Sequence, residues 1–313
     1  MQNTVVVAQA TDEGVLGRLR AHANVTVVTD NDAKSLTRAC RDAVCLQVGT
    51  WVKVTDEFLE QCPKLKVVSR TGVGVDNVDI EAASKRGVLV LNTPHANTLS
   101  VAEHTMALIL ALSKQLFVLD AHVRSGDFQI RRKYLPADLS GKTLGLIGFG
   151  NIGRTVAEKA SAAFSMEILA YDPFVKLAEP YVRLMETVED VVTNSDFVSI
   201  HLPLLPQTRG LFDAPMLSKM KQGAFLINTS RGGIVNEAAL CAALDVFENE
   251  PPAPGSALLH TDRLILTPHV AALTRECVLR VAETAAEGII DFLEGRQPKF
   301  IYNAKALGIE PPR

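Results

Sequence analysis

Short apolar runs alternate with segments of helical hydrophobic spacing along the whole chain of 313 residues. Runs that are almost continuously apolar are typical of strands in parallel sheets, which are covered on both faces. The alternation therefore predicts an α/β protein with largely parallel sheets. The expected strands are Thr4–Val7, Val25–Val28, Ala43–Val48, Lys66–Ser69, Val88–Leu91, Thr143–Ile147, Met166–Tyr171, Phe197–Leu202, Ala224–Thr229 and Leu264–Thr267.

The strands form two series, and the length of the chain suits about two domains. A long helix, Val101–Ser125, is expected between the series, with Ser100 and Glu103 as an S-x-x-E capping box. Its first half is apolar on nearly every face, which predicts burial in its own domain or against a second copy. We therefore expect a homodimer through the 100–124 helix region. A last helix, Arg275–Leu293, is expected to return the chain to the first domain.

A G-x-G-x-x-G lies between an apolar strand and a helix expected at Asn151–Phe164. Gly148 allows a tight turn, and Gly150 lets backbone approach a pyrophosphate. Gly153 lets the strand and the helix pack closely. The pyrophosphate then sits at a helix N-terminus, where unpaired N–H groups favour anions. The motif in this context predicts dinucleotide binding.

The residue at the end of the next strand indicates which dinucleotide. Asp172 can accept hydrogen bonds from a ribose diol and repels a 2′-phosphate, which favours NAD over NADP. Lys176 follows four residues later and could contact a phosphate, so the preference for NAD is not strict.

Three stretches at strand ends of the second series supply Arg231, Glu250 and His269. Open α/β sheets bind their ligands at such ends. Arg231 suits a carboxylate clamp, and His269 suits proton transfer near neutral pH. Glu250 could hold the histidine ring in one tautomer. Each residue alone is more often a surface or structural group, but the three together behind a dinucleotide motif favour reduction of a 2-oxo acid.

The chain resembles the D-isomer-specific 2-hydroxyacid dehydrogenase family, in particular its phosphoglycerate dehydrogenase-like branch without a regulatory domain. The resemblance implies two doubly wound parallel-sheet domains with a cleft between them. A flavodoxin-like substrate domain is expected at 1–95 plus 276–313, and a Rossmann NAD-binding domain at 96–275. The motifs that carry the resemblance are TGVGVDNVD at 71–79, VAEHT at 101–105, the glycine loop, HLPL at 201–204, NTSRGGIV at 228–235, LDVFENEP at 244–251 and PH at 268–269.

The resemblance implies NAD-dependent interconversion of a D-2-hydroxy acid and its 2-oxo acid. The family's catalytic trio falls on Arg231, Glu250 and His269, and its acidic contact to the nicotinamide amide falls on Asp245. The matching cofactor-binding positions are Gly148, Gly150, Asn151, Ile152, Gly153, Asp172, Thr105, His201, Pro203, Thr208 and Asp245.

The substrate-binding residues implied by the resemblance lie in the first domain. The amides of Val73 and Gly74 are expected to hold the substrate carboxylate, with Asn97 nearby. Arg70 could form a phosphate pocket for 3-phosphohydroxypyruvate together with the basic run 131–133. The alternative is that 131–133 is a solvated basic run and that the substrate is hydroxypyruvate or glyoxylate.

Composition excludes several other classes of protein. The net charge of −3 lacks the basic excess that nucleic-acid binding needs. No apolar run approaches the roughly 18 residues of a membrane span. The N-terminus enters a strand without a basic leader, and no His or Cys spacing suits a metal. His95, His104 and His201 are expected to be structural or to line a pocket. Buried, reduced thiols of a cytoplasmic protein are the expectation for Cys40, Cys45, Cys62, Cys241 and Cys277.

The segment 236–245 is shorter than the family pattern, which has a helix and then a strand after the arginine loop. A parallel crossover needs about ten to twelve residues, and the triplet AAL repeats at 238–240 and 242–244, as if helix and strand were fused. A shift of about 1 Å in Asp245 or Glu250 could cost on the order of a hundredfold in rate. A second hypothesis is therefore a catalytically weak NAD(H)-sensing binding protein of the same fold.

Overall fold

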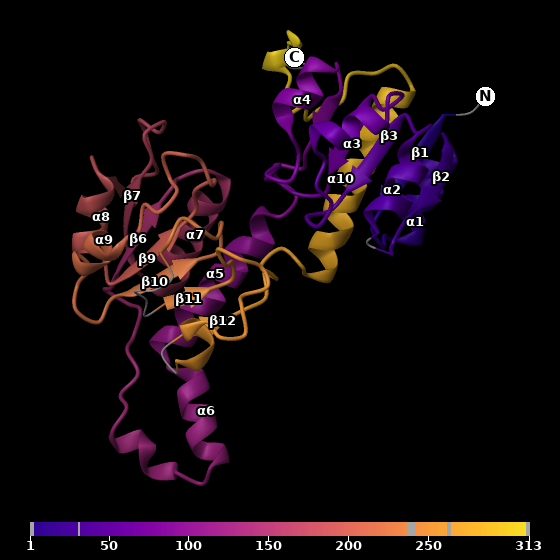
Figure 1. Cartoon of the computed structure of the whole chain (residues 1–313). Coiled ribbons are helices and arrows are strands. Elements are labelled where there is room, and N and C mark those ends of the chain that lie inside the picture. The colour runs from indigo at the N-terminus through magenta and orange to yellow at the C-terminus, as the bar shows by residue number, and fades with distance from the viewer. Residues whose placement is uncertain (1–2, 31, 237–241, 262–263, 311–313) are drawn as a thin grey trace. The chain divides into compact units, whose positions relative to one another are not determined.

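The computed structural model describes residues 3–30, 32–236, 242–261 and 264–310. The chain divides into two compact units, Met1–Asn97 with Leu273–Arg313 (unit 1) and Thr98–Ala272 (unit 2). Each unit has a parallel sheet of its own with helices on both faces (Figure 1). The α/β architecture with two parallel sheets that the hydrophobic pattern predicts is confirmed.

The described part of unit 1 has a five-stranded sheet in the order β2-β1-β3-β4-β5, with every pair parallel. This is the flavodoxin order. Its strands are β1 (Thr4–Ala8), β2 (Asn24–Val27), β3 (Cys45–Val48), β4 (Val67–Arg70) and β5 (Leu89–Leu91). Its helices are α1 (Glu13–Arg20), α2 (Ala33–Cys40), α3 (Asp56–Gln61), α4 (Ile80–Lys85), α10 (Arg275–Leu293) and the 3₁₀ turn η4 (Lys305–Leu307).

Successive residues of the strands in unit 1 face opposite sides of the sheet. Val6 and Ala8 of β1 lie in the cluster under α2, α3 and α4, whereas Val5 and Val7 lie in the cluster under α1 and α10. Burial on both faces explains why these strands are continuously apolar rather than alternating. The return of α10 to unit 1, which its place in the sequence predicts, is confirmed.

The described part of unit 2 has a seven-stranded sheet in the order β12-β11-β10-β9-β6-β7-β8. Counted from β6, this is the Rossmann order 3-2-1-4-5-6 with one further strand. Its strands are β6 (Thr143–Ile147), β7 (Glu167–Tyr171), β8 (Val182–Leu184), β9 (Phe197–Ile200), β10 (Phe225–Asn228), β11 (Ala242–Leu244) and β12 (Ile265–Leu266). Its helices are α5 (Thr98–Ser113), α6 (Leu116–Arg124), η1 (Phe128–Arg132), α7 (Asn151–Phe164), α8 (Val188–Asn194), α9 (Ala214–Ser218) and η3 (Ala257–His260).

The prediction of a single long helix at Val101–Ser125 is wrong. α5 ends at Ser113 and α6 begins at Leu116, because Gln115 takes a left-handed conformation with φ of 49°. The expected capping box is also wrong, since α5 begins at Thr98 and Ser100 is buried inside it. The apolar side chains of α5 pack on α7 and the sheet, while α6 buries no residue, so the two helices follow different surfaces.

Within the described residues, no single helix has the length and hydropathy of a membrane span. The two helices α5 and α6 meet that test only as a pair, and they are bent by 56°.

The cysteines that the structure describes are all buried and free of disulfides, as their odd number and spacing predict. Burial raises the pKa of the Cys45 thiol to about 12, which keeps it protonated and unreactive. The fifth residue of the prediction, Cys241, lies outside the described residues. The four described cysteines are Cys40, Cys45, Cys62 and Cys277.

Candidate active site

The glycine loop joins β6 to α7, and each glycine has a geometric reason. Gly148 has φ of 95°, and a Cβ on it would overlap the His201 carbonyl oxygen. A Cβ on Gly153 would overlap the Gly148 carbonyl oxygen. Gly150, by contrast, has no atom within 4 Å of where its Cβ would be, and it starts α7 without a side-chain cap. Open space beside uncapped helix amides fits a pyrophosphate.

Asp172 follows β7, and its carboxylate binds the backbone of the glycine loop. Its Oδ2 accepts from the Phe149 amide at 2.9 Å, and its Oδ1 accepts from the Phe174 amide at 2.9 Å. Each carboxylate oxygen has a further lone pair, so the group can still accept from a ribose diol. Lys176 is exposed.

The other predicted cofactor-binding residues of unit 2 lie at the carboxyl edge of its sheet or on α5. Burial lowers the pKa of His201 to about 4, so the ring is neutral where it lies beside Gly153, 3.0 Å from the Ser199 hydroxyl. Thr208 donates to the Pro203 carbonyl at 2.6 Å and so closes the loop after β9. Thr105 is fully buried on α5, 2.9 Å from the Thr229 hydroxyl. Asn151 and Ile152 form the first turn of α7.

Arg231 lies in a loop after β10 that Asn228 organises. The buried Asn228 side chain donates to the Arg231 carbonyl at 2.9 Å and accepts from the Ser230 amide at 3.0 Å. The next residue must be glycine, because a Cβ on Gly232 would overlap the Phe247 carbonyl oxygen. This close approach brings the Arg231 loop against the segment that carries Glu250.

Glu250 and His269 form a hydrogen-bonded pair, with 2.8 Å between Oε2 and Nδ1. Burial raises the pKa of Glu250, but hydrogen bonds from His269 and the Phe247 amide and the charge of Arg231 outweigh it, so the pKa lies below its usual value. An ionised Glu250 only accepts, so His269 carries a proton on Nδ1. The other ring nitrogen, Nε2, is then the one left for proton transfer, on a side chain that is 37% exposed.

Asp245 fixes the turn that carries His269. Its carboxylate is fully buried and accepts from the Val270 and Ala271 amides, both at 2.9 Å, and from the Thr267 hydroxyl at 2.6 Å. Its carbonyl accepts from the His269 amide at 2.8 Å.

Asp245 follows β11, which pairs in parallel with β10 in the register Leu226↔Ala242 to Asn228↔Leu244. The residues 237–241 of the shortened segment lie outside the described residues. Asp245 and Glu250 both hydrogen-bond to the turn that carries His269.

In unit 1 the predicted substrate residues share two neighbouring loops. Arg70 is 8% exposed, and its guanidinium lies over Gly72, directly before Val73 and Gly74. The loop after β5 is tied to this turn, since the Asn92 amide donates to the Val73 carbonyl at 2.9 Å. Farther along that loop, the Asn97 Oδ1 atom is buried without a hydrogen-bond partner among the described residues.

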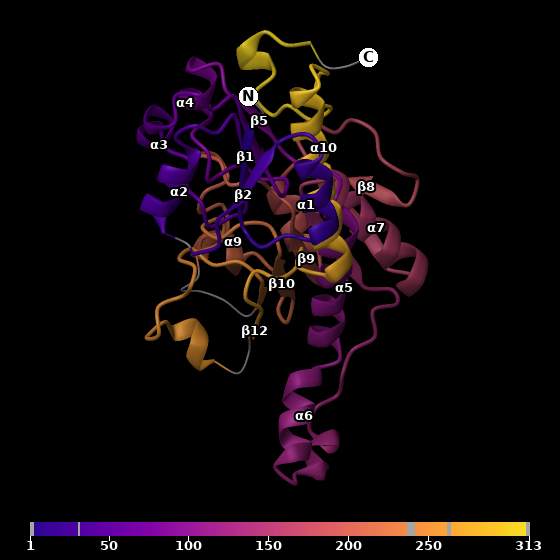
Figure 2. The ribbon, with the colours of Figure 1, turned by 90° about the vertical axis from the view of Figure 1, so that its right-hand side faces the viewer.

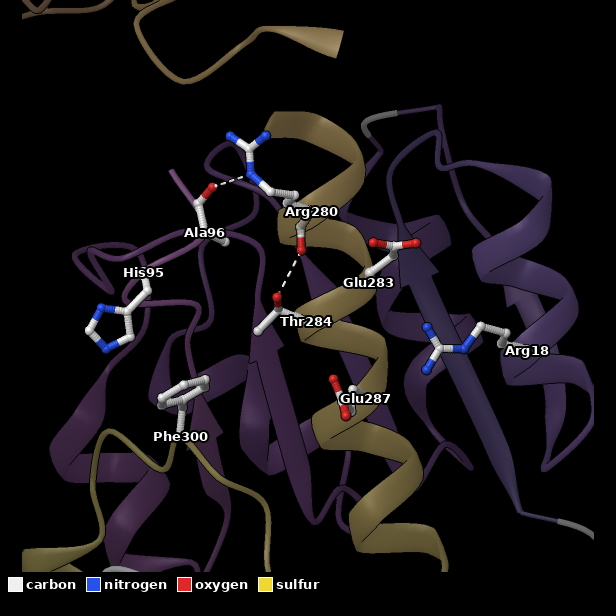
Figure 3. Close-up of a pocket in the computed structure, with 8 residues that line it drawn as sticks. All are labelled: Arg18, His95, Ala96, Arg280, Glu283, Thr284, Glu287 and Phe300. Atoms are coloured by element: carbon white, nitrogen blue, oxygen red, sulfur yellow. Dashed lines mark hydrogen bonds between the residues drawn. The ribbon is translucent and has the colours of Figure 1, made fainter. Parts of the chain in front are cut away.

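The residue before Asn97 is anchored to α10. Arg280 donates from Nε to the Ala96 carbonyl at 3.0 Å, and Thr284 donates to the Arg280 carbonyl at 2.8 Å (Figure 3). A cavity of about 350 Å³ opens beside this anchor, and the residues of the Arg70 turn do not line it. Its lining is Arg18, His95, Ala96, Arg280, Glu283, Thr284, Glu287 and Phe300.

The basic run 131–133 is exposed in and after η1 of unit 2, with Arg131 over the Phe128 ring at 4.8 Å. This exposure favours the alternative of a solvated run over a phosphate pocket. No group of three or more His, Cys, Asp or Glu side chains in the described part of the chain could hold a metal ion.

The glycine loop, the acid after β7 and the His–Glu pair define a dinucleotide-binding protein with an acid–base group at the carboxyl edge of its sheet. Residues 106–271 match the family model described as D-isomer specific 2-hydroxyacid dehydrogenase, NAD binding domain. The chain belongs to this family, and its cofactor is NAD.

Two solved structures and a curated relative are similar over most of this chain. D-3-phosphoglycerate dehydrogenase of Archaeoglobus fulgidus is 38% identical over 93% of the chain and 57% of its own length. The TT0316 protein from Thermus thermophilus is 33% identical with a TM-score of 0.87, covering 96% of this chain and 99% of that one. D-lactate dehydrogenase from Aquifex aeolicus, complexed with NAD and lactic acid, is 28% identical with a TM-score of 0.84, covering 99% and 100%. The chain spans somewhat more than half the length of the curated relatives it matches.

Proposed function

We propose that this chain is an NAD-dependent D-2-hydroxyacid dehydrogenase, which interconverts a D-2-hydroxy acid and its 2-oxo acid by hydride transfer. The observation that carries the proposal is the pair of His269 and Glu250, 2.8 Å apart, beside the Arg231 loop. The nicotinamide, when bound, supplies or accepts the hydride. The predicted cofactor-binding set, with Asp172 for the ribose and Asp245 for the nicotinamide amide, is part of this proposal.

The protein's own residues then handle charge and protons. Arg231 binds the substrate carboxylate and polarises the neighbouring carbonyl, which suits a guanidinium fork. His269 donates its Nε2 proton to the carbonyl oxygen as the alcohol forms and takes it back in the reverse direction. Glu250 stabilises the imidazolium form, and its lowered pKa keeps it ionised for that role. The partial exposure of His269 allows its proton to be replaced from solvent.

We assign substrate binding to unit 1, close to the predicted 1–95 plus 276–313. The amides of Val73 and Gly74 hold the carboxylate, and Asn97 Oδ1, which has no partner among the described residues, accepts from a substrate hydroxyl. The 2-oxo acid is 3-phosphohydroxypyruvate, whose reduced partner is 3-phosphoglycerate, or it is hydroxypyruvate or glyoxylate, each reduced to its own 2-hydroxy acid. Arg70, buried over Gly72, supports an anionic group at this turn in either case.

The test is oxidation of NADH by the purified chain with 3-phosphohydroxypyruvate, hydroxypyruvate and glyoxylate. We expect turnover, and His269→Ala should abolish it while NADH binding stays within about twofold. Arg70→Ala should lower efficiency most on the phosphorylated substrate if Arg70 binds its phosphate. Tight NADH binding without turnover on any 2-oxo acid would reject the dehydrogenase and favour the NAD(H)-sensing hypothesis.

The same proposal includes a homodimer through the helix region at 100–124. α6 and η1 form an arm that projects from the rest of unit 2 in both views, and α6 buries none of its residues (Figures 1 and 2). Some charges of the arm are paired within it, as in Asp120–Arg124 and His122–Asp127, and large apolar side chains are exposed between them. Such a surface suits a second copy. The exposed apolar side chains of the arm and the residues after it are Leu116, Phe117, Val123, Phe128, Tyr134 and Leu135.

Sedimentation of the full chain tests the dimer. We expect a dimer for the natural chain and a monomer for the double variant Phe117→Asp and Val123→Asp. An exposed substitution outside the arm, Val278→Asp, is the control. A natural chain that sediments as a monomer at high concentration would reject the proposal.

The buried thiols, which form no disulfide among the described residues, support the predicted cytoplasmic location of the protein.

A further inference from the structure

The Thr267 hydroxyl links a helix to the turn of the proposed catalytic histidine. Its oxygen lies 2.6 Å from Asp245 Oδ1 and 3.1 Å from His104 Nε2. A threonine has one hydroxyl proton, and the carboxylate can only accept, so Thr267 donates to Asp245. The Thr267 oxygen must then accept from His104, which fixes a proton on Nε2 of that ring. The chain of hydrogen bonds therefore runs from His104 through Thr267 to Asp245.

The end of this chain sets the backbone of His269. The two Asp245 oxygens accept from the Val270 and Ala271 amides, directly after the histidine. His269 itself has φ of 54°, a left-handed conformation that a residue other than glycine keeps only where its surroundings enforce it. The carboxylate that enforces it is fully buried, and the only side-chain groups within reach in the described residues are Thr267 and, at 3.6 Å, His104.

His104 connects these hydrogen bonds to a helix that is packed in the core of unit 2. It lies on α5, whose neighbouring residues Met106 and Ile109 are in the core of unit 2 and which packs along β10 and β11 (Figure 1). The His104 side chain is 21% exposed, so it is largely buried and still reaches solvent. A functional group supported from a packed helix is positioned more sharply than one supported by its loop alone.

We propose that His104 and Thr267 are positioning residues for His269, acting through Asp245. The inference rests on the proposed function, in which His269 transfers the proton. Loss of the Thr267 hydroxyl leaves Asp245 Oδ1 with one fewer donor and frees the carboxylate to rotate. The turn then loses the geometry that aims Nε2 of His269. A shift of about 1 Å at the reacting group costs on the order of a hundredfold in rate.

Paired substitutions separate positioning from packing. Thr267→Val removes the hydroxyl and keeps the shape, whereas Thr267→Ser keeps the hydroxyl. His104→Phe removes the donor, and His104→Gln keeps an N–H at the same number of bonds from the backbone. We expect kcat to fall roughly tenfold to a hundredfold in the valine and phenylalanine variants, and the serine and glutamine variants to recover most of it. Thr193→Val, which removes a hydroxyl from exposed α8, is the matched control and should leave kcat unchanged.

A second readout does not depend on turnover. Histidine-ring NMR spectra of the full chain, with His269 assigned from a His269→Gln variant, report the state of that ring directly. We expect its signals to shift or broaden in Thr267→Val and to return in Thr267→Ser. Altered signals in a protein that reduces no 2-oxo acid would reject the proposed function and keep the positioning inference. Natural ring signals together with natural kcat in folded Thr267→Val would overturn the inference itself.

Discussion

Replacement of Glu250 by glutamine tests the acid–base pair with the smallest change in shape. The glutamine oxygen can still accept from His269 Nδ1, so the change removes the negative charge, 2.8 Å away, and also the hydrogen bond that the second carboxylate oxygen accepts from the Phe247 amide. A hydrogen bond to a charged group contributes about 1.5–3 kcal/mol, against about 1 kcal/mol for a neutral one. The difference is about 1–2 kcal/mol, and since both side chains are more than a third exposed, solvent screening reduces it to about 1 kcal/mol.

This difference acts on the protonated ring, which is the form that donates in the reductive direction. We therefore expect kcat/KM for reduction of the 2-oxo acid to fall about fivefold to tenfold, since about 1.4 kcal/mol is a factor of ten. Because Glu250 has a lowered pKa, it stays ionised at neutral pH in the natural chain, so the loss should appear across the neutral range.

The assay is the pH dependence of NADH oxidation for the natural chain and for Glu250→Gln, with Glu248→Gln as the control. The control removes the same charge two residues away in the same segment. We expect the natural profile for the control. If Glu250→Gln retained both the natural efficiency and the natural profile, Glu250 would be only a turn carboxylate, and the reasoning about tautomer and imidazolium would be refuted.

Three further predictions concern stability. Gly232→Ala should destabilise unit 2 by about 3 kcal/mol or more in urea unfolding, because its Cβ would overlap the Phe247 carbonyl oxygen; a loss below about 1 kcal/mol would contradict the close approach. His201 has a pKa of about 4 in the fold against 6.5 unfolded, so the unfolded state takes up the proton first and stability falls as pH falls from 6.5 to 4. In His201→Gln the free energy of unfolding should fall by about 2 kcal/mol less between pH 6.5 and pH 4 than in the natural chain, and an equal fall in both would reject the buried neutral ring. Gln115→Gly should stabilise the protein by about 1 kcal/mol in thermal unfolding, since the left-handed φ of 49° suits glycine, and a lower Tm would count against that account.

The hydrophobic pattern predicted those parts of the fold in which local sequence and burial agree. The strands covered on both faces were found within a residue or two, and the helices Asn151–Phe164 and Arg275–Leu293 have the predicted bounds. The strands β8 and β11 were not predicted; in β8 the exposed Arg183 interrupts the apolar run. The break at Gln115 was missed because the apolar spacing continues across it while the chain leaves the core.

For the site, the sequence predicted the residues that react better than the residues that hold them in place. Arg231, Glu250 and His269 could be proposed because their residue types suit one reaction and follow strand ends. The roles of His104 and Thr267 could not be predicted, since the two are 163 residues apart and meet only in the folded unit. The left-handed turn at His269 was equally hidden, because it is enforced by the buried Asp245 carboxylate and not by a glycine.

Strand pairing, rather than the segment before it, sets the place of Asp245 at the edge of the sheet. The position of Asp245 follows from the parallel register of β11 on β10, and β12 pairs on the far side with Leu244↔Leu266. Strand pairing thus brings the loops after β10, β11 and β12 to one edge, whatever length of chain connects the strands. Cross-links between these loops then set the finer geometry: Gly232 against Phe247, and Asp245 onto the turn of His269. The pairing of Asn228 with Leu244 shows that the parallel register of β11 on β10 is kept to the last residue before Asp245.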